Sequence, residues 1–330
     1  MRTFTFKGLL LTAVFMLLGC LSIQAANDDL IIKQITIKLD KAGTLPDRIA
    51  SSKKYKITNL KIVGEINGTD WNMIREMAGR NYQESSTEGN LSVLDLSEAK
   101  IVAGGDYYYY DNLFNNKVYT SNDEIGEYAF AYCSGLTSLT LPVGITSIGE
   151  FVFSGCSGLT SLTLPAGITS IGEYAFSRCS GLTSLTLPAG ITSIDKYAFS
   201  GCSRLTSLTL PAGITSIGEF AYSYCSGLTS IYVYAEKVPR IGRYAFEGCA
   251  SRKCTLYVPK GTYDNYRLSE FGYFENIVEF DATGIDKTTT STDVEEVSRY
   301  SLNGQRLVGP TKGLNIVKYS DGSVKKVAVQ

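Results

Sequence analysis

The chain has 330 residues and a formal net charge of −1 at pH 7, and its 44% hydrophobic residues are enough for one long domain or two ordinary ones. It contains no histidine, which excludes Ser-His-Asp and Cys-His nucleophile systems and removes the commonest metal ligand. It also has no block of basic residues, so we expect neither nucleic acid nor an anionic membrane surface as a partner.

Residues 1–25 have the pattern of an export signal. Two basic residues precede an apolar run, residues 8–19, that is too short to span a bilayer as a helix. Ala25 fits cleavage by signal peptidase I, whereas Cys20 ends a lipobox-like run and would then be acylated. We favour cleavage after Ala25, because strand-like sequence begins at Leu30 and leaves little tether for a lipid anchor. Both routes export the protein, to the cell surface or into the medium.

Residues 26–124 are predicted to form an N-terminal cap with degenerate repeats. Residues 30–40 alternate between apolar and polar side chains, as a strand does. Asp70 is placed to cap a short helix that runs through Gly79. The tyrosine-rich stretch 104–123 is predicted to be a loop. A special end structure is expected because an open solenoid end exposes both core and strand edge.

A repeat of 23 residues determines the fold class. A period in this range with regularly spaced leucines indicates a leucine-rich repeat. In one unit Leu162 and Leu164 alternate with Thr163, which is the two-residue period of a strand with one buried face. Pro165 ends this strand, and a short helical or 3₁₀ turn is expected over residues 150–154. The isoleucines that open successive units are Ile125, Ile148, Ile171, Ile194, Ile217 and Ile241.

The predicted fold is therefore a leucine-rich-repeat solenoid, with a parallel β-sheet and short helical or 3₁₀ turns. It has an α+β cap at its N-terminal end and a small C-terminal β module. Stacked strands about 4.8 Å apart bury the leucines of neighbouring units against each other. The expected parts are the repeats at 125–258, a C-terminal cap at 259–281, a Thr- and Asp-rich linker at 282–296, and a β module at 297–330.

The repeat pattern resembles a known family. The motif I-G-x-x-A-F-x-x-C-x-x-L-x-x-L-x-L-P, as in Ile171–Pro188, is similar to the BspA-like leucine-rich repeats of Bacteroidetes surface proteins. Residues 70–79 and 94–96 resemble the N-terminal caps of that group, and residues 255–261 resemble its C-terminal caps. The tail resembles the β modules used for type IX export, but we favour a small surface domain or tail over a sorting module. The resemblance implies a non-catalytic role in adhesion, by analogy of fold.

One cysteine per turn forms a regular row that we interpret as buried packing. The spacing of about 4.8 Å lies within disulfide range, but parallel side-chain directions are poor disulfide geometry. Cys249 and Cys254 are the best candidates for a bonded pair. Without a Cys-x-x-Cys motif or histidine, no metal or cofactor site is expected. The row consists of Cys133, Cys156, Cys179, Cys202, Cys225 and Cys249.

Two exposed rows are candidates for ligand contact. The outer face of the sheet carries a neutral hydroxyl row, which either reflects β-propensity and solubility or forms a weak, repetitive contact surface. Its threonines are Thr140, Thr163, Thr186 and Thr209. An aromatic row either covers the core or forms a ribbon for proteins or the faces of sugars, extended by Tyr132, Tyr224 and residues 107–110. Its members are Tyr128, Phe151, Tyr174, Tyr197, Phe220 and Tyr244.

No catalytic residues are expected. A glycosidase needs only two carboxyl groups, but Glu127, Glu150 and Glu173 occupy equivalent exposed positions and do not converge. The sequence favours an exported, adhesin-like protein that binds a protein or glycan on host or microbial surfaces, with Cys20 as the only route to a membrane. A carbohydrate-binding protein and a structural spacer remain alternatives. Because the repeats are nearly identical, no single repeat looks specialised for one ligand.

Overall fold

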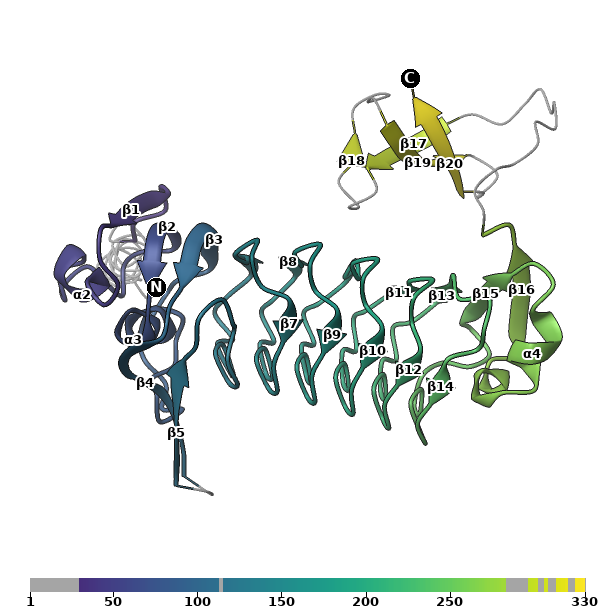
Figure 1. The fold of residues 1–330 in the computed structure, drawn as a ribbon, viewed down its shortest axis with the longest axis horizontal. Helices are drawn as coiled ribbons and strands as arrows, with labels where there is room; N and C mark the ends of the chain where they lie inside the picture. Colours follow the sequence, from purple (N-terminus) through teal and green to yellow (C-terminus); the bar gives the residue numbers. More distant parts are fainter. Residues whose placement is uncertain are drawn as a thin grey trace, which may run out of the picture.

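The computed structural model describes residues 30–112, 115–282, 296–301, 306–307, 313–319 and 324–329. The leader, with Cys20 and both cleavage alternatives, lies outside the described residues. The chain forms an elongated solenoid with a cap at each end of the stack of turns (Figure 1). The leucine-rich-repeat solenoid with a parallel sheet, which the repeat predicts, is confirmed.

The N-terminal cap contains one main helix, and the residue that caps it differs from the prediction. The helix starts at Gly68, and Asn67 is its N-cap, accepting the N–H of Thr69 at 3.1 Å. Asp70 completes a capping box by accepting the N–H of Asn67 at 2.9 Å. The elements are β1 (Ile35–Leu39), α2 (Leu45–Arg48), β2 (Asn59–Ile66), α3 (Gly68–Met77) and β3 (Val93–Ile101).

The stretch 104–123 was expected to be a loop but contains a β-hairpin. Strands β4 (Gly104–Asp111) and β5 (Asn116–Thr120) pair antiparallel and project from the cap (Figure 1). Consecutive tyrosines favour a strand, and Tyr108 and Tyr109 bury their rings against the cap. These packing contacts, rather than any turn signal, decide the structure of this stretch.

The larger sheet is parallel but is divided in two. Residues 184–186, which were expected to form one of its strands, are not a strand, although Thr206 N still donates to Thr183 O at 3.2 Å. Leu185 is nevertheless buried there at 8% exposure, the same as Leu162 in the preceding turn. One part adds β6 (Ser138–Thr140) and β8 (Ser161–Thr163) to β1, β2 and β3; the other consists of β11 (Ser207–Leu210), β13 (Ser230–Val233), β15 (Thr255–Pro259) and β16 (Asn276–Phe280).

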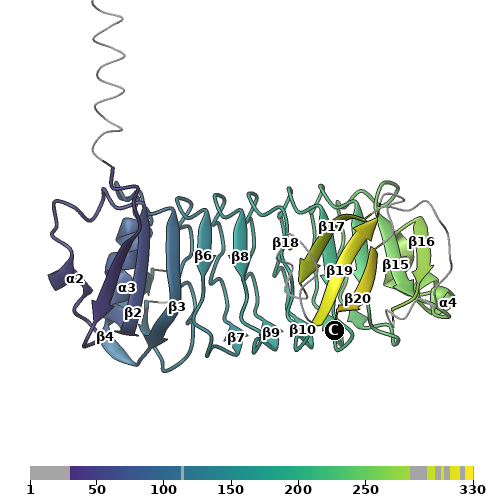
Figure 2. The same ribbon diagram turned by 90° about the horizontal axis from the view of Figure 1, so that it is seen from above.

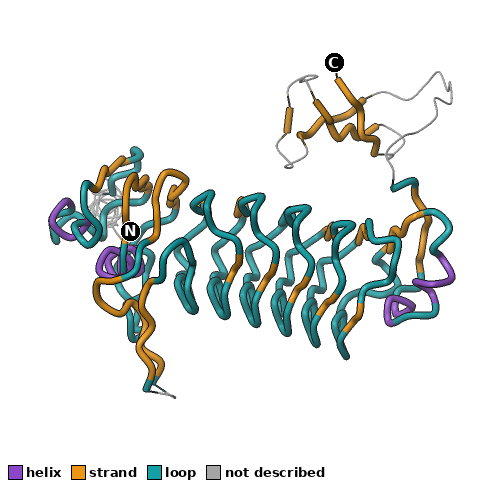
Figure 3. Tube along the Cα trace, viewed as in Figure 1, coloured by secondary structure: helices purple, strands orange, loops and turns teal. Residues whose placement is uncertain are grey.

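A second, smaller parallel sheet runs along another side of the solenoid, seen beside the larger one in Figure 2. Each strand has two residues, and equivalent residues pair in register, as Ser193 does with Ser216. Loops join the strands of every turn (Figure 3). The strands are β7 (Ser147–Ile148), β9 (Ser170–Ile171), β10 (Ser193–Ile194), β12 (Ser216–Ile217) and β14 (Arg240–Ile241).

The expected helical or 3₁₀ turn at residues 150–154 is wrong. The segment forms hydrogen-bonded turns and no helix. Phe151 has φ 54° and Gly155 has φ 72°, both in the left-handed region. Left-handed residues interrupt both kinds of right-handed helix. Alternate N–H groups of this segment instead donate to the next turn, as Phe153 N does to Ala175 O at 2.7 Å.

The C-terminal end of the stack is closed by α4 (Tyr263–Arg267), the 3₁₀ helix η1 (Glu270–Tyr273) and β16. Phe271 and Phe274 are fully buried there. Later in the chain, an antiparallel sheet contains β17 (Glu296–Ser301), β18 (Arg306–Leu307), β19 (Gly313–Tyr319) and β20 (Val324–Val329).

The N-terminal cap also completes the hydrogen bonds of the first turn. In later turns, a carbonyl such as Val152 O accepts an N–H from the preceding turn, here Phe130 N at 2.8 Å. The first turn has no preceding turn, so buried side chains donate in its place, which satisfies backbone acceptors that would otherwise be costly. The pairs are Tyr108 to Glu127 O at 2.9 Å, Trp71 to Ala129 O at 2.9 Å, and Arg75 to Ala131 O at 3.4 Å.

Candidate binding surfaces

The aromatic row occupies an unusual backbone conformation at the outer corner of each turn. All six residues have left-handed φ angles between 53° and 58°. Such angles cost a non-glycine residue about 1–2 kcal/mol. The turn-to-turn hydrogen bonds offset this cost, since the N–H of each ring-bearing residue from Tyr128 to Phe220 donates to the next turn, as Phe151 N does to Glu173 O at 2.9 Å.

The rings of this row stack on each other. Successive centroids from Tyr128 to Tyr244 are 4.6–5.1 Å apart, and Tyr109 of the cap extends the stack at 4.1 Å. Each ring therefore gives its faces to its neighbours and only an edge to solvent. Tyr244 ends the row with 59% exposure. A sugar ring packs against the face of an aromatic ring. In this row only the terminal ring, Tyr244, leaves one face uncovered by another member of the row.

The tyrosines expected to extend the aromatic row have separate locations. Tyr132 and Tyr224 are exposed, and each lies over a glycine of the next turn; a Cβ on Gly155 would come within 2.5 Å of the Tyr132 ring. Of residues 107–110, Tyr108 and Tyr109 are buried in the cap. Tyr107 instead contacts rings of Tyr82, Tyr110 and Tyr119 and lies beneath the Lys117 ammonium on the hairpin.

The cysteine row is buried and its thiols are free. Each thiol from Cys156 to Cys249 donates to the carbonyl oxygen of an aromatic residue one turn earlier, at 3.0–3.2 Å. Burial raises the pKa of the Cys156 and Cys179 thiols, so they stay protonated and unreactive at neutral pH. Cys249 and Cys254 are also free, so the candidate pair is not bonded in this structure.

An inner aromatic row lies beside the cysteines. Its rings are fully or almost fully buried, and neighbouring centroids are 4.9–5.6 Å apart. Trp71 of the N-terminal cap contacts its first ring at 5.3 Å, and Phe271 contacts its last at 5.5 Å. The row consists of Phe130, Phe153, Phe176, Phe199, Tyr222 and Phe246.

The hydroxyl row lies on the outer face of the larger sheet. Thr163, Thr186 and Thr209 are exposed and Thr140 is half-buried. Among the described residues, none of these four hydroxyls has a hydrogen-bond partner. A neighbouring row differs, because Thr160 and Thr206 donate their hydroxyls to backbone carbonyls of the preceding turn at 3.0 and 3.3 Å. Within the described residues, the hydroxyls of the first row are therefore all unpartnered, whereas most of those in the neighbouring row are engaged.

At the C-terminal side the same row changes to aromatic residues, which we did not predict. Thr209 pairs in register with Tyr232, and Tyr232 pairs with Tyr257. The two tyrosine rings stack with centroids 4.4 Å apart, and Phe280 contacts Tyr232 edge-on at 6.0 Å. Burial raises the pKa of Tyr232 to about 12. Aligning the unit that begins at Ile217 with earlier units would have revealed Tyr232 in a threonine position.

The carboxyl groups of Glu127, Glu150 and Glu173 lie one per turn along the solenoid and do not converge. Burial, followed by the charges of Glu127 and Asp195, raises the pKa of Glu150, and burial followed by Glu150 raises that of Glu173. These carboxyl groups repel each other along one line, one per turn. They surround no common cavity, so the arrangement does not resemble an acid and base on either side of a substrate.

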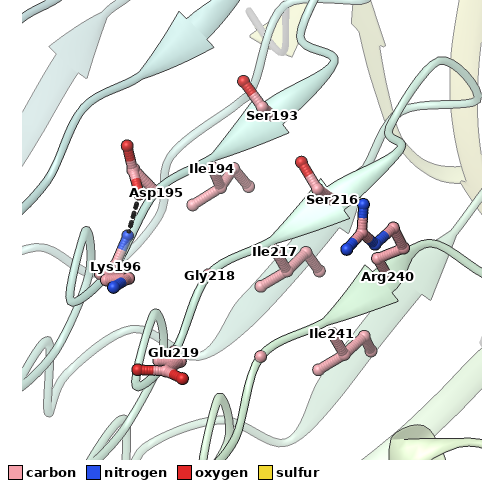
Figure 4. Close-up of a pocket in the computed structure, with 11 residues that line it drawn as sticks. Ser193, Ile194, Asp195, Lys196, Ser216, Ile217, Gly218, Glu219, Arg240 and Ile241 are labelled. Carbon is pink, nitrogen blue, oxygen red and sulfur yellow. Dashed lines mark hydrogen bonds between the residues drawn. The ribbon is translucent and has the colours of Figure 1, made fainter.

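A hollow of about 360 Å³ lies over β10, β12 and β14 of the smaller sheet (Figure 4). Ile194 and Ile217 are buried beneath it. Ser193, Ser216 and Arg240 occupy equivalent places along one side. Its other charged lining residues are Asp195, Lys196 and Glu219. Asp195 accepts the backbone N–H of Lys196 at 2.8 Å.

The described part of the chain has neither a metal-binding cluster nor a membrane-spanning helix. No group of three or more His, Cys, Asp or Glu residues there is arranged to hold a metal ion. None of the helices in that part has the length and apolar character needed to cross a bilayer.

Several solved structures resemble this one. A leucine-rich repeat protein of T. pallidum, TpLRR, is 30% identical with a TM-score of 0.36, and the match covers 40% of this chain and 60% of that protein. A leucine-rich cell surface protein of Faecalibacterium prausnitzii is 23% identical with a TM-score of 0.34, covering 68% and 51%. The pneumococcal vaccine antigen PcpA is 14% identical with a TM-score of 0.39, and the match covers 76% of this chain and 68% of that protein. This chain thus spans less than two thirds of the first two proteins.

A family model identifies the repeats. No curated protein matches the chain. Residues 107–255 match the BspA type leucine-rich repeat region in six copies. The matched segment contains the two aromatic rows and the cysteine row described above, so the packing and the sequence pattern refer to the same units. Residues 107–255 of this chain therefore belong to the BspA-type leucine-rich repeats.

Proposed function

We propose that this protein is an exported, non-catalytic binding protein that acts as an adhesin, holding macromolecules of host or microbial surfaces on an extended face of its solenoid. The observation that carries the proposal is the hydroxyl row Thr140, Thr163, Thr186 and Thr209, whose hydroxyls are unpartnered among the described residues. Export rests on the leader-like residues 1–25.

A face of this kind suits weak contacts that add up. Each turn offers the same small polar side chains at the same height, so a ligand makes similar contacts with successive turns. Linked weak contacts raise the overall affinity far above that of one turn. The inner aromatic and cysteine rows serve this purpose only by holding the turns in register.

The aromatic row is a weaker candidate for binding sugars than its composition indicates, since its faces are covered by stacking. We therefore assign the extended contact to the sheet face. The structural-spacer alternative makes the opposite prediction, because a spacer needs no ligand on any face.

Binding of residues 26–330 to an array of matrix proteins and glycans tests the proposal. A face variant carries Thr140→Glu, Thr163→Glu and Thr209→Glu. A matched control carries three glutamates on exposed loop residues of three turns, Ala166→Glu, Ala189→Glu and Ala212→Glu. We expect the face variant to lose at least about tenfold in affinity, as desolvated polar contacts do when replaced by charge, and the control to keep it. An array without any binding, or equal losses in both variants, contradicts the proposal.

A further inference from the structure

The hollow over β10, β12 and β14 is the place where the repeat pattern breaks. The other five turns have a glycine where Asp195 stands, and four of these have a glutamate where Lys196 stands. Four turns end with a serine at the position of Arg240. The three departures are up to 45 residues apart in the chain, as their numbers show, yet all line one hollow.

The two sides of the hollow offer different chemistry. The Arg240 guanidinium stands in the same row as the hydroxyls of Ser193 and Ser216, so this side presents hydrogen-bond donors to an anion (Figure 4). No ion pair engages Arg240 among the described residues. A free guanidinium is suited to bidentate recognition of a carboxylate.

The remaining charges narrow the class of ligand. Asp195 and Glu219 also line the hollow, and carboxylates accept hydrogen bonds from hydroxyl groups. They would repel a phosphate dianion, since two acidic side chains offset the charges of Arg240 and Lys196. The apolar floor is covered, because Ile194 and Ile217 are only 1% and 2% exposed, so an apolar peptide side chain finds little to contact. A ligand with one carboxylate and several hydroxyl groups matches both the side lined by Arg240 and the side lined by Asp195 and Glu219.

We propose that this hollow binds one carboxylated sugar residue of an acidic polysaccharide. Arg240, with Ser193 and Ser216, holds the carboxylate side, while Asp195 and Glu219 accept the hydroxyl hydrogens. A volume of about 360 Å³ lies at the lower end of the range of roughly 300–1,000 Å³ for small-molecule sites, which suits a single residue. The site is separate from the hydroxyl row, so its failure leaves the proposed adhesive face standing.

Calorimetry on residues 26–330 tests the site with three probes: tetragalacturonate, its methyl ester, and tetraglutamate. The ester removes the charge but keeps the hydroxyl groups, whereas tetraglutamate supplies carboxylates on a peptide. We expect tetragalacturonate to bind at least about tenfold more tightly than either of the others, with an affinity that falls as salt is added. Equal affinity for the ester, a preference for tetraglutamate, or no binding of tetragalacturonate overturns the proposal.

The repeats supply their own test variants. Asp195→Gly, Lys196→Glu and Arg240→Ser together restore the residues of the other turns, so this variant should fold as they do. Arg204→Gly is the control, because it also restores the repeat residue but lies outside the lining. The triple variant should lose at least about tenfold in affinity for tetragalacturonate, and Arg204→Gly should lose none. Unchanged binding in a folded triple variant overturns the assignment.

Discussion

The turns that begin at Ile125, Ile148 and Ile171 and those that begin at Ile194, Ile217 and Ile241 share a backbone but differ at the surface. Both groups bury an aromatic ring and a cysteine at the same positions. Only the second group carries Asp195, Lys196 and Arg240 in the hollow. The difference teaches that stacking against a like neighbour keeps inner positions uniform, while outer positions are free to diverge.

The largest expected effect tests whether the interiors are equivalent. Phe153→Ala in the first group and Phe199→Ala in the second should each lower the free energy of unfolding by about 3–5 kcal/mol, because each leaves a large cavity in the inner row. Urea unfolding followed by circular dichroism measures both. A difference of more than about 2 kcal/mol between them would break the comparison, since it would show that the two interiors are packed differently.

The next largest loss of stability is expected from a substitution in the N-terminal cap. Arg75→Met removes the fully buried donor to carbonyls of the first turn and should cost about 2–3 kcal/mol through unsatisfied acceptors. Arg80→Met is the control. Arg80 donates to Tyr132 O at 3.2 Å and to Ser86 at 3.2 Å in exposed contacts, and to Glu84 O at 2.8 Å in a partly buried one, so its loss should cost only about 1 kcal/mol. Equal costs in urea unfolding would mean that the cap does not act as a preceding turn.

The outer aromatic row should contribute less than the inner row. Tyr174→Ala removes two stacking contacts and should cost about 1–2 kcal/mol. Tyr174→Gly should cost less than the alanine variant, although glycine usually destabilises, because residue 174 has φ 53°. Thermal unfolding of both variants compares their melting temperatures. A higher melting temperature for the alanine variant would contradict the left-handed conformation of residue 174.

The smallest effect depends on pH. Burial, with Glu127 and Asp195 nearby, raises the pKa of Glu150 above its ordinary value of 4.5. Between these two pKa values the folded chain holds more protons than the unfolded chain, so stability falls as pH rises. Glu150→Gln should remove this contribution and raise the melting temperature at pH 7 slightly, by about 1 °C or less. A lower melting temperature at pH 7 would show that the carboxylate is favourably placed.

The sequence predicted the core and most strands of the larger sheet, because both depend on local patterns, but it missed the hairpin of residues 104–123 and the smaller sheet. Leu162 and Leu164 alternate with Thr163 and are buried as this period requires. The turn backbone was missed, because an aromatic residue such as Phe151 gives no sign of a positive φ. One signal was available: Gly155, Gly201 and Gly248 recur at a second left-handed position of the turn.

The binding surfaces were only partly predictable. The hydroxyl row follows from strand alternation, and the structure places its threonines on the outer sheet face. The hollow depends on residues from three turns, and no single unit contains its pattern. A comparison of the units position by position would have located Asp195, Lys196 and Arg240 as departures, but not their proximity.

Deleting one whole unit tests most directly whether binding resides in the divergent turns. Removal of residues 148–170 or of residues 194–216 takes out 23 residues each and keeps the register of the stack. Only the second deletion removes Asp195 and Lys196. With tetragalacturonate as ligand, we predict affinity within about twofold of the parent chain after the first deletion and a loss of at least about tenfold after the second. Equal affinities in the two folded deletion variants would contradict the account.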